Sequence, residues 1–238
     1  MSINRMLPLL LNEMEYFSKE DYVSAMKEEY SISEPQIAYD LKKRLDSGSI
    51  IRFGWDKYTV SNNKEIYSYE YSDEVLDIVS VIDDNYVSLN YQIFELVQLN
   101  EFVNHMIAHN CIFVYVENEL QEYVFDTLRN VYPGRVMLRP SLNEYYRYAV
   151  DDEIIVMRLP SETPKGTDNP WACRLEKIIV DILTDKFVKE IVPDDEKDNI
   201  VHGAYENYLL DEDTMIRYAK RKGAEKKIKE ELNKYKVD

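Results

Sequence analysis

Apolar residues in the first part of the chain repeat at helical spacing, most regularly between Ser33 and Asp46. In that stretch an apolar side chain returns every four positions, which predicts a helix with one buried stripe. The stripe consists of Ile37, Leu41 and Leu45, with Ala38 beside it. Ser33 and Gln36 have the spacing of a capping box, so the helix should begin at Ser33, and Gly48 follows where it should end.

Two more helices are expected before that one. The first should begin just before Pro8, because proline is tolerated only in the first turn of a helix. Its apolar positions are Ile3, Met6, Leu7, Leu10, Leu11 and Met14. Ser18 with Asp21 three residues later predicts the start of a second helix. The inner face of that helix should consist of Tyr22, Val23, Met26 and Tyr30.

Two short runs follow, residues 49–53 and 57–61, and predict a pair of strands joined by a tight turn. Three helices followed by a two-stranded ribbon are the element order of a winged helix-turn-helix, which we expect over residues 1–61. In such a domain the third helix is offered to the DNA major groove, and the ribbon lies where phosphates pass. The residues expected to contact DNA are Gln36, Tyr39, Lys42, Lys43, Arg44, Arg52 and Lys57. Asp40 is expected on the same solvent-exposed face. The alternative is that such a domain docks to a protein rather than to DNA.

After a polar linker at residues 62–64, predicted strands alternate with predicted helices. The run CIFVYVE, residues 111–117, is the strongest strand and should lie centrally in a mixed sheet. Other strands are expected over residues 66–71, 87–96, 135–138 and 153–159. Helices are expected over residues 73–82, 100–109 and 119–130, then from Pro170 onward, and twice near the C-terminus. The expected fold class is α+β, with the winged helix-turn-helix followed by a mixed α/β domain, residues 65–238, that has a helical C-terminus.

The distribution of charge limits which surfaces could bind nucleic acid. The chain of 238 residues has a formal net charge of −16. Residues 42–57 nevertheless hold five basic residues against two acidic ones, and residues 217–236 hold nine against three. Binding to DNA should therefore be modest and sensitive to salt. In the basic tail, Arg217, Lys220 and Arg221 share one helix face and form either a second nucleic-acid contact or a solvated face.

The sequence offers little that predicts catalysis. His105 and His109 are one helical turn apart, but no third metal ligand is evident, and Met106 stands where a metalloprotease has its glutamate. Asp181 and Asp185 could meet at one ion, although Lys177 and Lys186 nearby favour a solvated charged face. No catalytic residue, metal or cofactor is therefore expected, and the chain is interpreted as a non-enzyme.

The two cysteines, Cys111 and Cys173, lie in apolar surroundings and are expected to be buried free thiols. The apolar run near the N-terminus is too short for a signal peptide, and no segment is long enough to span a membrane. A cytoplasmic protein without membrane contact is expected.

Three segments, in their order after the expected winged helix, resemble a known family: YQIFELVQLNEFVNHMIAHNCIFVYVE (91–117), RLEKIIVDILTDK (174–186) and MIRYAKRKG (215–223). The chain resembles the AbiEi-type antitoxins of bacterial type IV toxin-antitoxin systems, which act in abortive infection, a form of phage defence. The resemblance implies an N-terminal winged helix that binds double-stranded DNA at its own promoter and represses its operon. It also implies a C-terminal domain that counteracts a nucleotidyltransferase toxin, for which a stable complex is not required.

The chain departs from that family in its acidity, because such antitoxins are often basic over both domains. Extensive DNA contact by the second domain is therefore not expected. The expected function is a DNA-binding transcriptional repressor with antitoxin activity. The alternative is a metal-dependent nuclease that carries a winged helix as its targeting domain.

Overall fold

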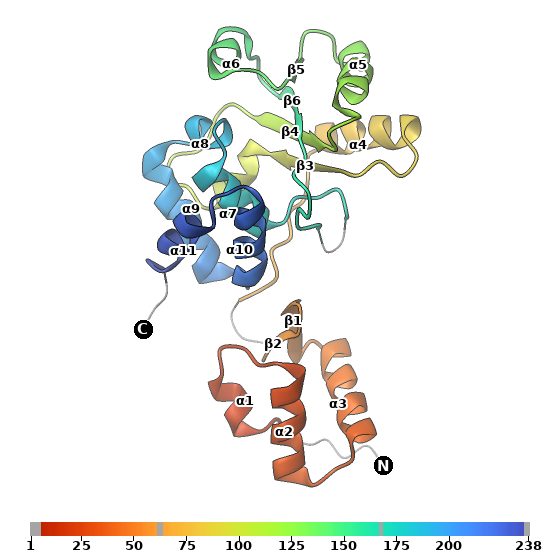
Figure 1. Ribbon diagram of the computed structural model, residues 1–238, viewed down its shortest axis with the longest axis vertical. Coiled ribbons are helices and arrows are strands. Elements are labelled where there is room, and N and C mark those ends of the chain that lie inside the picture. The colour runs from red at the N-terminus through yellow and green to blue at the C-terminus, as the bar shows by residue number, and fades with distance from the viewer. Residues whose placement is uncertain (1–5, 61–63, 167–168, 236–238) are drawn as a thin grey trace. The chain divides into compact units, whose positions relative to one another are not determined.

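The computed structural model describes residues 6–60, 64–166 and 169–235 and divides the chain into two compact units (Figure 1). Unit 1 comprises residues 1–66 together with the short segment 207–211, and unit 2 comprises residues 67–206 and 212–238. The segment joins unit 1 through backbone hydrogen bonds: Glu65 donates to Asn207, and Leu209 donates to Glu65. Ile3 and most of the linker, for which expectations were stated, lie outside the described residues.

Unit 1 contains three helices and one small sheet in its described part. The elements are α1 (Leu9–Glu13), α2 (Lys19–Tyr30), α3 (Glu34–Asp46), β1 (Ile50–Gly54) and β2 (Lys57–Val60). The two strands are antiparallel and pair Ile50 with Val60. Each of the five elements contributes to the core, together with Phe17 between α1 and α2. Its buried residues are Leu11, Phe17, Tyr22, Ala25, Met26, Ile37, Leu41, Ile50 and Tyr58. The three predicted helices and the two predicted strands of this region are thus confirmed as elements.

The ends of α2 and α3 follow the predicted capping chemistry. The backbone amide of Ser18 donates to the carboxylate of Asp21 at 2.8 Å, and the amide of Asp21 donates back to the Ser18 hydroxyl at 3.1 Å. At α3, the backbone amide of Ser33 donates to the side-chain oxygen of Gln36 at 3.1 Å. These contacts satisfy amides that have no partner within the helix, so they fix where each helix begins.

Three expectations about unit 1 were wrong. Helix α1 spans only five residues, so it buries Leu11 alone and leaves Met6 and Leu10 exposed. Ala38 is exposed rather than part of the buried stripe of α3. Asp40, expected in solvent, is buried because its carboxylate accepts hydrogen bonds from two side chains described below.

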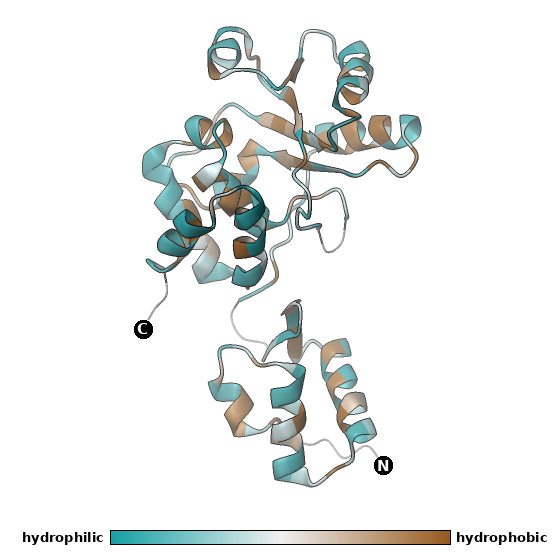
Figure 2. Cartoon of the chain, viewed as in Figure 1, coloured by the Kyte–Doolittle hydropathy of each residue, from teal (hydrophilic) through white to brown (hydrophobic). Residues whose placement is uncertain are grey.

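Unit 2 is organised around a four-stranded mixed sheet with the strand order β3-β4-β6-β5. The strands are β3 (Tyr91–Glu95), β4 (Cys111–Val116), β5 (Val136–Leu138) and β6 (Glu153–Arg158). Strand β4 pairs antiparallel with β3 and parallel with β6, and β5 pairs parallel with β6. All six residues of β4 are buried, and Figure 2 shows hydrophobic residues along β3 and β4. The predicted central strand and the mixed sheet are confirmed.

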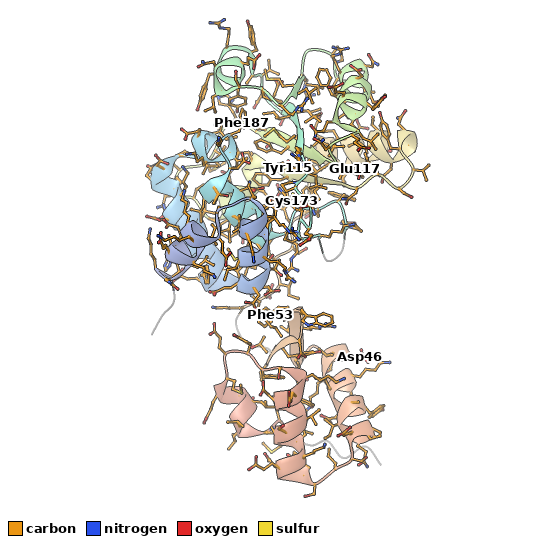
Figure 3. All side chains as sticks on the ribbon, viewed as in Figure 1. Asp46, Phe53, Tyr115, Glu117, Cys173 and Phe187 are labelled. Carbon is orange, nitrogen blue, oxygen red and sulfur yellow. The ribbon has the colours of Figure 1, made fainter. Side chains whose placement is uncertain are left out.

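Helices cover both faces of this sheet. The described helices of unit 2 are α4 (Asp73–Asn85), α5 (Gln121–Val131), α6 (Leu142–Tyr148), α7 (Leu175–Thr184), α8 (Val188–Ile191), α9 (Asp194–Asn207), α10 (Glu212–Arg221) and α11 (Glu225–Leu232). One face packs against α4 and α5 through Ile112, Val114 and Val116. The other face carries Phe113 and Tyr115, which meet Phe187 before α8 and Lys177 of α7 (Figure 3). Successive side chains of β4 point to opposite faces of the sheet, so this strand packs against a separate layer of helices on each face.

Four predicted elements of unit 2 differ from the structure. Residues 66–71 form no strand, the strand expected over 87–96 is limited to β3, and the helix expected from Pro170 begins only after Arg174. The helix expected over residues 100–109 is replaced by a 3-10 helix, Leu96–Glu101, and a loop. In that loop, the side chain of Asn100 exchanges two hydrogen bonds with the backbone of Ile107, which holds the chain in a non-helical path.

The two cysteines are buried and free, as expected. Within the described ranges, the chain contains no helix with the length and apolar character needed to cross a membrane.

Candidate nucleic-acid interface

The exposed face of α3 carries four of the seven residues predicted to contact DNA. Gln36, Tyr39, Lys42 and Lys43 are all exposed, and the Tyr39 ring is 70% accessible. The face exists because Ile37 and Leu41 point into the core and turn the remaining positions outward. An α-helix with its side chains is about 10–12 Å across, which matches the width of a DNA major groove, about 12 Å.

Arg44 lies at the border of this face and points away from solvent. Its Nε donates to the Asp40 carboxylate at 2.6 Å, and the hydroxyl of Tyr22 donates to the same oxygen at 2.6 Å. The Arg44 side chain is only 15% exposed. Burial opposes the charge of Arg44, but its interactions with Asp40 and Tyr22 together outweigh this and raise the pKa of the guanidinium. Arg44 therefore supports the carboxylate through which Asp40 of α3 binds Tyr22 of α2, and the prediction that Arg44 contacts DNA is not supported by its position.

The hairpin of β1 and β2 presents Arg52 but not Lys57 to solvent. Arg52 is exposed, and its guanidinium lies 5.9 Å from the ring of Trp55 and 5.8 Å from the ring of Tyr58. The Lys57 side chain is 13% exposed, and its Nζ pairs with Asp211 at 3.2 Å within unit 1. Of the two predicted contacts on the hairpin, Arg52 is available in this structure and Lys57 is engaged elsewhere.

Trp55 is an exposed residue of this surface that sequence analysis did not select. It forms the two-residue turn of the hairpin together with Asp56, whose φ is +52°. The indole is 81% exposed, more than any other aromatic side chain in the described part of the chain. The sequence did indicate its exposure, because Trp55 lies inside the predicted turn, where a large apolar side chain cannot reach the core.

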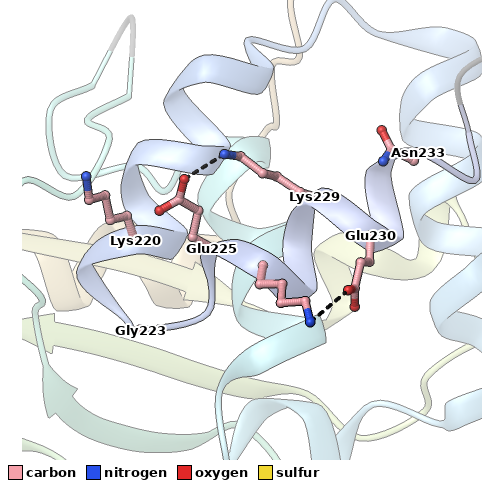
Figure 4. Close-up of a pocket in the computed structure, with 7 residues that line it drawn as sticks. Lys220, Gly223, Glu225, Lys229, Glu230 and Asn233 are labelled. Atoms are coloured by element: carbon pink, nitrogen blue, oxygen red, sulfur yellow. Dashed lines mark hydrogen bonds and ion pairs between the residues drawn. The ribbon is translucent and has the colours of Figure 1, made fainter.

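The basic tail is less positive at its surface than its sequence indicates. Arg217, Lys220 and Arg221 are exposed on one face of α10, as expected, and Arg221 forms a bidentate pair with Glu162. Lys226 and Lys229 pair with Glu230 and Glu225 across a shallow groove of about 530 Å³ (Figure 4). Most of the tail's cations thus have a carboxylate neighbour, so this surface is a weaker candidate for nucleic acid than α3.

Lys222, which the sequence placed in the basic tail, belongs instead to a buried charge network. Its Nζ contacts Asp181 at 2.6 Å and Asp185 at 3.0 Å. The other Asp181 oxygen pairs with Lys177 at 2.7 Å, and this lysine is 1% exposed. The hydroxyl of Tyr218 also donates to Asp181, at 3.0 Å. The solvated face expected around Asp181 was therefore wrong, because α10 packs over it and Lys222, directly after α10, supplies a second cation.

The network keeps its charges because each ion has a close partner. Burial opposes ionisation of Asp181, but Lys177 and Lys222 outweigh this and lower its pKa. Burial likewise opposes the charge of Lys222, and the two aspartates raise its pKa. Lys177 Nζ also lies 3.3 Å from the centre of the Tyr115 ring, which is a favourable position for a cation. The signal in the sequence was the i, i+4 spacing of Lys177 and Asp181 in a helix whose other residues, apart from Glu176 and Thr184, are apolar.

The two histidines considered as metal ligands do not share a helix. His105 Nδ1 lies 2.9 Å from Glu196, and His109 Nδ1 lies 3.5 Å from Asp151. Among the described residues, no group of three or more His, Cys, Asp or Glu side chains is placed to hold a metal ion.

Comparison with curated proteins gives no match for this chain. A family model described as a family of unknown function, DUF6577, matches residues 36–238, and the chain therefore belongs to that family.

Proposed function

We propose that the chain is a DNA-binding transcriptional repressor whose unit 1 acts as a winged helix-turn-helix. The observation that carries the proposal is the exposed polar and basic face of α3, followed directly by a hairpin that exposes Arg52. Lys42, Lys43 and Arg52 are suited to phosphate contacts, and Gln36 has an amide that can bond a base edge. The order of three helices and a two-stranded sheet supports the use of α3 as the recognition helix.

A mobility-shift experiment with the DNA upstream of the gene tests this proposal. We expect a shifted band at low salt that weakens at moderate salt, because phosphate contacts release counterions. An unrelated duplex of equal length and base composition serves as the control and should bind more weakly. Equal binding to both duplexes would contradict repression of the protein's own promoter, and no shift at low salt would contradict DNA binding.

We further propose that unit 2 carries antitoxin activity against a nucleotidyltransferase toxin, as the sequence resemblance implies. The observation in favour of separable roles is that unit 2 has its own core, formed between the mixed sheet and helices α4 and α5. A fragment with its own core is expected to fold by itself. Repression would then need residues 1–61, and neutralisation of the toxin would need residues from about 65 onward.

Growth of cells that express the neighbouring toxin tests this second role. Residues 65–238 should restore growth while the promoter stays unrepressed, and the full chain should do both. Far-ultraviolet circular dichroism of the purified fragment checks that it is folded. A folded, soluble fragment that fails to restore growth would contradict the division of roles.

A further inference from the structure

We propose that Trp55 is a DNA-contact residue, and that its indole lies against the sugars and base edges of a duplex groove while Arg52 contacts a flanking phosphate. The inference rests on the proposed function and adds a non-electrostatic contact to it. Tryptophan side chains are highly buried on average, yet this indole is 81% exposed at the tip of a hairpin. Aromatic and apolar side chains at such positions supply stacking and wedge contacts to nucleic acids.

The turn that carries Trp55 is held in place from below. The carboxylate of Asp56 accepts a hydrogen bond of 3.0 Å from the backbone amide of Lys19, at the start of α2. Phe17 and Tyr58 exchange two backbone hydrogen bonds of 2.8 and 2.9 Å beneath the hairpin. The base and turn of the hairpin are thereby fixed, so binding would not have to order this part of the backbone.

Arg52 gives the exposed indole a positive neighbour. The guanidinium lies 5.9 Å from the Trp55 ring, and its Nε donates to the carbonyl oxygen of Gly54 at 3.3 Å. An exposed aromatic ring beside a cation matches a duplex groove, in which sugars and base edges lie between two rows of phosphates. This pairing favours nucleic acid over a purely apolar partner surface.

Fluorescence can report on Trp55 alone, because the chain contains only two tryptophans. The other, Trp171, is partly buried and lies 4.9 Å from the ring of Tyr71. In the Trp171→Phe variant, duplex DNA from upstream of the gene should change the emission of Trp55 and protect it from acrylamide. In the matched Trp55→Phe variant, the emission of Trp171 should not respond to the same DNA.

Affinity measurements complete the test. Trp55→Ala should weaken binding by about 5-fold or more, the ratio that corresponds to a contact of about 1 kcal/mol. The salt dependence should be unchanged, because the indole neutralises no phosphate. Trp55→Phe should restore part of that loss. If the duplex binds but neither the emission of Trp55 nor the affinity of Trp55→Ala changes, the inference is overturned and the proposed function stands. If the wild-type chain binds no duplex at low salt, the proposed function itself fails.

Discussion

At the scale of residues, periodicity predicts which side chains of α3 are exposed but not which of them pair. Gln36, Tyr39, Lys42 and Lys43 are exposed as the apolar stripe requires. The spacing of the apolar residues alone could not show that Arg44 does not belong to the predicted DNA-contact surface. Its partner Asp40 is anchored by Tyr22 of another helix, and a contact between helices leaves no signal in the sequence of one of them.

Arg44→Ala and Lys43→Ala should therefore affect different properties, the first stability and the second DNA binding. Arg44→Ala leaves Asp40 buried without its cation, and we expect it to lower the free energy of unfolding by about 1–3 kcal/mol. Lys43→Ala changes an exposed position and should leave stability unchanged while it weakens DNA binding. Urea unfolding and a binding titration of both variants provide the comparison. Equal stability of the two variants would contradict a structural role for Arg44.

At the scale of elements, strand β4 was easier to predict than the loop that precedes it. Strand β4 is apolar at every position and was recognised directly, whereas residues 100–109 have helical periodicity and do not form the expected α-helix. Glu196 of α9 accepts hydrogen bonds from the backbone amides of Asn104 and His105, both at 3.0 Å. A carboxylate distant in the sequence thus binds amides that a helix would have used, which local patterns cannot show.

Glu196→Ala should release that loop. Its hydrogen bond with Asn199, together with those from the two loop amides, lowers the pKa of Glu196 to about 2, so the carboxylate is charged at all ordinary pH values. We expect hydrogen exchange at Asn104 and His105 to accelerate in the variant, with little change in β4. Glu190→Ala, at a half-exposed position in α8, is a suitable control. Unchanged exchange at both amides would show that other contacts hold the loop.

The buried network between α7 and α10 should make stability depend on pH at both extremes. The folded pKa of Asp181 lies below its ordinary value of 3.8, so its stabilisation is present above that value and is lost as pH falls through the folded pKa. The folded pKa of Lys222 lies above 10.5, so its stabilisation is complete below 10.5 and is lost as pH rises through the folded pKa.

Replacement of Lys222 by methionine tests the network directly. Lys222→Met should lower the free energy of unfolding at neutral pH, because it removes one of the two cations that Asp181 contacts in the interior. Lys226→Met is the matched control, since the Lys226 side chain is 92% exposed in its pair with Glu230. Thermal unfolding from about pH 3 to about pH 11 measures both. If the two variants are equally stable at neutral pH, the network does not join α7 to α10 energetically.

At the scale of the whole molecule, the sequence predicted an α+β chain with a mixed sheet, and it overestimated the number of available cations. Five of the seven expected contact residues are exposed, but Arg44 and Lys57 are held in ion pairs. The exposed cations of this surface are Lys42, Lys43 and Arg52. If each neutralises one phosphate, log K should fall with log salt at a slope of about −2.7. A slope near twice that value would mean that ion-paired residues or the basic tail also take part.

Binding of duplex DNA by a charge-reversed variant tests the central proposal most directly. Lys43→Glu with Arg52→Glu should abolish binding of the upstream duplex at low salt without unfolding the protein, because both side chains are exposed. Arg129→Glu with Arg147→Glu makes the same change in net charge at exposed positions of unit 2 and serves as the control. We expect loss of binding in the first variant and near wild-type binding in the second. Wild-type affinity in the first variant, or equal loss in both, would contradict the assignment of this surface.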